Sequence, residues 1–216
     1  MLQIFIQDIC NMRFHFLLAA ILIFTINSVY SQTFRAHILG GAATSQISGD
    51  QLAGFNKAGI IGGAGVNTTL SKKALLSFEI YFIQKGSQKQ TDVENNDLEY
   101  YRLRLNYIEI PVLLEYHVSE KLSIQLGPCI GSLISSSEEN QFGQLDFQPS
   151  FIKYEVSVIG GLNYYFGENW GMLFRGEQSI APVREHGSGA VYRLNRGQYN
   201  SVLLFGMFYR FGNSKK

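Results

Sequence analysis

The chain has 216 residues, a formal net charge of +1 and charged side chains at only 16% of its positions. This length suits one domain, and a net charge so close to zero gives no electrostatic reason to expect nucleic acid as a partner. The 22 glycines, the 4 prolines and the 13% of aromatic residues are typical of a β-rich protein with many turns.

The first 31 residues have the pattern of a secretory signal peptide. Arg13 precedes an apolar run at residues 14–26, and residues 29–31 resemble a cleavage site before Gln32. We therefore predict a signal peptide at 1–31, with Met12 as the working start, and a barrel domain at 32–216. A retained N-terminal membrane anchor is the alternative.

The two cysteines exclude an intrachain disulfide in the predicted mature domain. Cys10 precedes the apolar run, so it is not a lipoprotein cysteine, and Cys129 is then the only thiol left. Stability must come from packing or from closure of a sheet.

Eight strands are predicted in chain order, and no segment after residue 32 has the 3.6-residue period of a helix. Their approximate ranges are 33–43, 58–67, 74–85, 100–118, 122–135, 149–166, 170–180 and 197–211. Strands one and eight have the least regular alternation, and the run at 202–205 leaves the phase of strand eight open.

The fourth strand shows the alternation most clearly. One set of side chains is apolar: Ile108, Ile110, Val112, Leu114, Tyr116 and Val118. The other set includes ionisable groups: Tyr107, Glu109, Pro111, Leu113, Glu115 and His117. In a soluble sandwich the apolar set would face the core, whereas in a membrane barrel it would face lipid.

The lengths of the connections favour the barrel. Long segments at 44–57, 86–99, 136–148 and 181–196 alternate with short ones at 68–73, 119–121 and 167–169. Outer-membrane barrels have long extracellular loops and short periplasmic turns. We therefore predict an all-β, eight-stranded antiparallel up-and-down transmembrane β-barrel in the cell outer membrane.

Outward apolar sets place a polar network in the lumen. An eight-stranded barrel is just wide enough for side chains to fill, and buried ionised groups must pair. We predict a plugged lumen and no water-filled pore. Arg35 is expected to face inward as well; the predicted lumen-facing network is Glu79, Glu109, Glu115, Lys153, Glu155, Arg175, Glu177 and Arg210.

Two local features carry structural predictions. Pro111 lacks the N–H that a strand ladder needs, so it predicts a bulge, an irregularity or a kink within strand four. The last strand alternates Phe205, Met207, Tyr209 and Phe211, and Tyr209 and Phe211 resemble the C-terminal signal read by the barrel assembly machinery. Five residues continue beyond Phe211.

Four segments of the chain resemble the PorT family of outer-membrane β-barrel proteins, which is typical of the Bacteroidota. They are YIEIPVLLEY at 107–116, the Glu79–Gly86 segment, GFNKAGIIGGAGV at 54–66 and the YRF ending at 209–211. The resemblance covers nearly the whole predicted mature chain and implies an eight-stranded barrel without a catalytic motif. The namesake of the family supports protein secretion through the type IX system.

No catalytic, cofactor or metal site is predicted. His117 and Glu115 lie near Ser119 and Ser123, but the chain has no G-x-S-x-G motif for a hydrolase. The acidic stretch at 92–99 lacks the glycine and the spacing of a calcium loop. The glycines at 62–65 are not followed by a helix, so they indicate a curved barrel wall better than a nucleotide site.

These observations predict a small, porin-like outer-membrane barrel with a structural or interaction role, and not an enzyme. Its expected partners are outer-membrane lipid, the barrel assembly machinery during biogenesis and a protein partner at the extracellular loops. The alternatives are an accessory barrel for protein export of the type IX kind, a barrel-embedded hydrolase and a secreted soluble carrier.

Overall fold

The computed structural model describes residues 34–50, 52, 54–91, 98–145, 150–185 and 197–212. The chain divides into two compact units, 1–33 and 34–216, and all the described residues belong to the second unit. The predicted signal peptide at 1–31 therefore lies outside them. Within these ranges, no helix has the length and apolar character required to cross a membrane.

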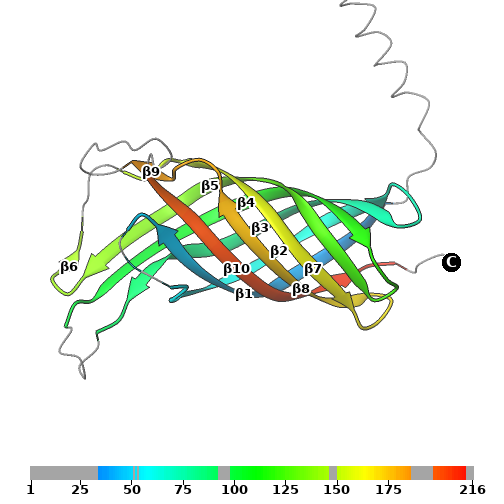
Figure 1. The fold of residues 1–216 in the computed structure, drawn as a ribbon, viewed down its shortest axis with the longest axis horizontal. Coiled ribbons are helices and arrows are strands. Elements are labelled where there is room, and N and C mark those ends of the chain that lie inside the picture. Colours follow the sequence, from blue (N-terminus) through cyan, green and yellow to red (C-terminus); the bar gives the residue numbers. More distant parts are fainter. Residues whose placement is uncertain are drawn as a thin grey trace, which may run out of the picture. The chain divides into compact units, whose positions relative to one another are not determined.

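Eight long strands and two short ones make up the described fold (Figure 1). The long strands are β1 (Phe34–Ser48), β2 (Lys57–Thr69), β3 (Ala74–Lys89), β4 (Tyr101–His117), β5 (Leu122–Asn140), β7 (Tyr154–Tyr165), β8 (Trp170–Ser179) and β10 (Gly197–Arg210). The short strands are β6 (Gly143–Gln144), which pairs with β5, and β9 (Arg184–Glu185), which pairs with β10.

The eight long strands close into an antiparallel ring, as the sequence predicts. Each pairs with its neighbour in the order β1, β2, β3, β4, β5, β7, β8, β10, and β10 then pairs with β1. The closing ladder runs from His37 opposite Arg210 to Ser48 opposite Tyr199. Closure pairs each of the eight long strands on both sides, which is a requirement in lipid because the hydrocarbon offers no hydrogen bonds.

The predicted faces agree with the burial of the side chains. In β4, Ile110 and Leu114 point outward and are about half exposed, whereas Glu109, Leu113 and Glu115 point inward and are fully buried. The strands β3, β7 and β8 alternate in the same way. The outer surface is consequently an apolar band whose members include Ile60, Phe78, Ile80, Leu126, Ile130, Val156, Phe174 and Phe205.

The structure also decides the phase of strand eight. Leu204, Phe208 and Arg210 are buried in the interior, and Phe205 and Met207 face outward. In the closing ladder Phe208 is opposite Leu39 and Leu204 is opposite Ala43. These residues belong to one apolar cluster inside the barrel.

Several strands run further than predicted at the long-loop end. β1 reaches Ser48, β3 reaches Lys89 and β5 reaches Asn140, although the sequence predicts loops there. Backbone hydrogen bonds to the neighbouring strands maintain these extensions, and such pairing does not depend on apolar outward side chains. The strand predicted from residue 149 begins only at Tyr154.

Pro111 does not produce a bulge. The pairing of β3 with β4 is interrupted beside it, but the register is the same on both sides: Phe78 is opposite Val112 and Tyr81 is opposite Glu109. The register shift in β4 lies instead between Asn106 and Tyr107, in its pairing with β5. The ladder between β4 and β5 is also interrupted just after Pro111, between the pair Pro111–Cys129 and the pair Leu114–Leu126, with no change of register. The proline is thus accommodated as a local irregularity without a bulge.

Candidate functional site

Ionisable side chains from several strands meet in the barrel interior. Seven of the eight predicted lumen residues lie there, each at most 7% exposed: Glu79, Glu109, Glu115, Glu155, Arg175, Glu177 and Arg210. They form three clusters at different heights, which we call the middle, lower and upper clusters.

Lys153 is the exception, and its predicted position is wrong. It precedes β7 and its side chain is exposed, with Nζ 5.8 Å from the centre of the Tyr154 ring. The strand begins one residue later, so the period-two phase does not extend to Lys153. Arg35, also expected to face inward, is partly exposed and donates a hydrogen bond to the Gly212 carbonyl.

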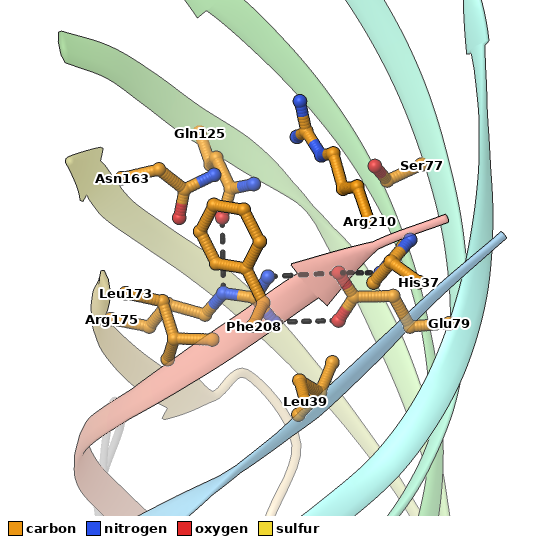
Figure 2. Close-up of a pocket in the computed structure, with 10 residues that line it drawn as sticks. All are labelled: His37, Leu39, Ser77, Glu79, Gln125, Asn163, Leu173, Arg175, Phe208 and Arg210. Atoms are coloured by element: carbon orange, nitrogen blue, oxygen red, sulfur yellow. Dashed lines mark hydrogen bonds and ion pairs between the residues drawn. The ribbon is translucent and has the colours of Figure 1, made fainter. Parts of the chain in front are cut away.

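The middle cluster is centred on a bidentate ion pair between Glu79 and Arg175 (Figure 2). The two guanidinium nitrogens of Arg175 lie 2.6 and 2.8 Å from the two carboxylate oxygens of Glu79. Its Nε donates to Gln125 at 3.0 Å, and Nε2 of His37 lies 3.2 Å from Glu79 Oε1. Such paired hydrogen bonds fix both side chains and satisfy charges that would otherwise be costly to bury.

Gly65 makes room for this pair. A Cβ atom at Gly65 would lie 2.7 Å from the His37 ring and 2.8 Å from Cγ of Glu79. The residue is opposite Glu79 in the ladder between β2 and β3 and opposite His37 in the ladder between β1 and β2. A side chain at this position would therefore occupy the space that Glu79 uses to reach Arg175.

The lower cluster surrounds Glu115 near the short-turn end. Arg210 donates to Glu115 Oε2 at 2.8 Å, and Ser123 donates to Oε1 at 2.6 Å. Tyr165 also donates to Oε1, and the guanidinium of Arg210 lies 4.8 Å from the centre of the Tyr165 ring. Gln125 joins the lower cluster to the middle one because its amide nitrogen donates to Glu115 while its oxygen accepts from Arg175.

The upper cluster is built around Lys85, which is not a member of the predicted network. Its Nζ lies 2.5 Å from Glu109, 2.7 Å from Glu177 and 3.3 Å from Glu155, and the side chain is fully buried. The signal was present, because Lys85 is in phase with inward-facing Tyr81 in the same strand. It was missed because Lys85 is the last residue of the predicted strand.

Little free space remains between the middle and lower clusters. The pocket in Figure 2, between the middle and lower clusters, has a volume of about 10 Å³. A cavity of roughly 10–15 Å³ is the minimum for a single water molecule. This part of the lumen is therefore filled by side chains and does not hold a water column.

The serines near His117 are engaged in ways that do not suit a hydrolase. Ser123 donates its hydroxyl proton to Glu115, and the Ser119 hydroxyl accepts the backbone amides of Lys121 and Leu122. A nucleophilic serine would instead donate to the histidine that acts as its base. The acidic stretch considered for calcium lies mostly outside the described residues, at 92–97.

Sequence comparison assigns the barrel to a family. The model of the family described as outer membrane protein beta-barrel domain matches residues 28–185, which is more than half of the chain. The chain belongs to this family. Together with the apolar outer band, membership places the protein in the outer membrane, which excludes the soluble carrier.

The fold of this outer-membrane barrel is similar to known structures. Ail, the attachment invasion locus protein of Yersinia pestis, matches with a TM-score of 0.50 and 14% identity over 82% of this chain and 98% of that chain. Neisserial surface protein A matches with a TM-score of 0.49 and 13% identity over 84% and 100%. A comparison with curated protein sequences finds no match.

Proposed function

We propose that this outer-membrane barrel is a non-conducting scaffold with a structural or interaction role, and that it is not an enzyme. The observation that carries the proposal is the closed interior. Three ion-paired clusters lie at successive heights of the lumen, and Gln125 connects two of them directly. Moving these charged groups aside to open a pore would break buried ion pairs, each of which is costly to disrupt.

The first expected result is therefore an absence of conductance. The purified protein, reconstituted into planar bilayers at neutral pH, should insert without stable current steps. Heat-modifiable migration of the recovered protein on gels provides the control that folded barrels are present. Reproducible stepwise conductance from such samples would contradict the scaffold proposal, because it requires a continuous water path through the clusters.

We propose that the hairpin formed by the end of β5 and by β6, at the long-loop end, binds another protein. β5 continues to Asn140 and turns back through Gln141 and Phe142 into β6. Phe142 is 87% exposed at this turn, and its backbone amide donates to the Asn140 side chain. This exposed ring, which the hairpin holds beyond the apolar band, is the contact point that we propose for a partner.

The base of this hairpin is also ordered by specific contacts. Arg184 forms an ion pair with Glu138 at 3.0 Å, and its guanidinium lies 4.6 Å from the centre of the Phe151 ring. Tyr101 donates to the other carboxylate oxygen of Glu138 at 2.5 Å. These contacts connect β5 to its neighbours beyond the apolar band and hold the hairpin in a defined position.

Crosslinking from the hairpin tests the interaction role. A photoreactive amino acid at Phe142 should give a discrete crosslinked protein in intact cells, and the same group at Ser119 in a short turn should not give that product. Phe142→Ser should remove a partner that is captured from a second position, Gln141. Identical products from Phe142 and Ser119 would count against a specific partner at this end.

The finer assignment to the PorT family, and with it a role in protein export, rests on the motif resemblance alone. It extends the same proposal, because an export accessory would also present its hairpin to a partner. A secretion component among the products crosslinked from Phe142 would support this role. Normal secretion in a strain that lacks the gene would argue against it. The C-terminal signal at Tyr209 and Phe211 likewise stays a prediction.

A further inference from the structure

The upper cluster contains more negative than positive charge. Lys85 is the one cation within ion-pair distance of Glu109, Glu155 and Glu177 among the residues that the structure describes. With all four groups ionised, three carboxylates and one ammonium leave a net charge of −2. Arg175, the other cation in this part of the lumen, is already paired with Glu79 through both terminal guanidinium nitrogens.

Oxygens within this cluster also lack partners. Oε1 of Glu109 and Oε1 of Glu177 face the Lys85 ammonium, whereas Oε2 of each has no hydrogen-bond partner among the described residues. The hydroxyl of Tyr81, a residue only 1% exposed, also has none there. Tyr81 is directly opposite Glu109 in the ladder, so both side chains enter the same part of the lumen.

A thiol completes the group. Cys129 is 1% exposed and follows the same inward phase of β5. The ligand atoms of Glu109, Cys129 and Glu177 lie within 4.8 Å of one another. In a tetrahedral zinc site, metal–oxygen distances of about 2.0–2.2 Å and metal–sulfur distances of about 2.3 Å place ligand atoms about 3.4–3.6 Å apart, so the three side chains must move closer by roughly 1 Å to bind one ion.

We propose that Glu109, Cys129 and Glu177 bind one divalent transition-metal ion, such as Zn²⁺, inside the barrel. One carboxylate oxygen of each glutamate and the sulfur supply three ligands. The Tyr81 hydroxyl, whose residue is opposite Glu109 in the ladder, is a candidate for the fourth. Lys85 continues to neutralise the opposite oxygens. A thiolate with two carboxylates favours a borderline ion such as Zn²⁺ or Co²⁺ over Ca²⁺ or Mg²⁺, which prefer oxygen ligands alone.

The charge balance supports this assignment. Binding of a divalent ion adds two positive charges, and coordination releases the thiol proton, so the cluster changes from −2 to −1. The alternative is that protons alone neutralise the excess carboxylates. Both arrangements remove buried charge, and they differ in whether a metal–sulfur bond forms. This inference goes beyond the scaffold role, and conductance or crosslinking results do not decide it.

Cobalt provides the test, because a thiolate bound to Co²⁺ gives a charge-transfer absorption band. The Cys10→Ser protein, in which Cys129 is the only thiol, is unfolded in urea with a chelator and a reductant, and the chelator is removed. It is then refolded in detergent with Co²⁺ and freed of unbound ion. We expect bound cobalt with the thiolate band, and competition by Zn²⁺ but not by Mg²⁺.

Two variants make the test specific. Cys10→Ser/Cys129→Ser should lose the band, and Glu177→Gln should bind Co²⁺ at least about tenfold more weakly. Ser123→Ala, a buried substitution in the lower cluster, should bind as the parent does. Gel mobility verifies that each barrel is folded, and Glu177→Gln decides the matter if the cysteine variant does not fold. The proposal would be overturned if the folded Cys10→Ser protein bound no more cobalt than Cys10→Ser/Cys129→Ser does, or if it bound cobalt without the thiolate band.

Discussion

Replacement of Arg175 by methionine should lower the free energy of unfolding by about 3–5 kcal/mol, because it leaves the Glu79 carboxylate buried without its cation. Glu79 is only 4% exposed, and its other charged or polar neighbour in the middle cluster is His37. The measurement is urea unfolding of the refolded protein in lipid vesicles, followed by the gel mobility of unheated samples.

A double variant separates the charge effect from the loss of packing. Glu79→Leu/Arg175→Met removes both charges and should recover most of the lost stability, since a buried ion pair and apolar residues of similar volume are often equivalent. The matched control is Lys89→Met, which removes a partly exposed ion pair with Glu99 and should cost about 0–1 kcal/mol. A similar loss for Arg175→Met and Lys89→Met would show that the middle cluster is hydrated.

Ile110→Arg should destabilise the barrel by about 2–4 kcal/mol, because the side chain lies on the lipid-facing surface of β4. Ile110 is 52% exposed on that surface and is flanked across the ladder by Ile130. An arginine there must bring its charge into the hydrocarbon or distort the bilayer around it. Unfolding in urea from lipid vesicles again provides the measurement.

Two further arginine variants serve as controls for Ile110→Arg: one near the membrane boundary and one on the outward face of another strand. Val118→Arg, on the same outward set but just beyond the end of β4, should cost only about 0–1 kcal/mol, since the penalty falls toward the interface. Val156→Arg, on the outward face of β7, should behave like Ile110→Arg. Normal stability of both Ile110→Arg and Val156→Arg would mean that these faces do not contact lipid.

The period-two pattern is sufficient to predict the strands, their faces and most of the buried charges. Each strand of a barrel this size has one face toward lipid and one toward the lumen, so alternation along the chain translates directly into position. Glu79, Glu109 and Glu115 could be placed inside from their neighbours in sequence alone. The alternation of long and short connections then distinguishes a barrel from a sandwich.

The pairing of those charges was decided only by the tertiary structure. Glu79 and Arg175 come from β3 and β8, which are not neighbours in the sheet, and Lys85 reaches Glu155 and Glu177 in the same way across the lumen. Which groups meet depends on the closure and stagger of the ring, and local alternation carries no information about either. The period-two pattern also does not predict where strands end. Backbone pairing extends β5 past its apolar residues, and β7 begins after Lys153, which therefore does not enter the lumen.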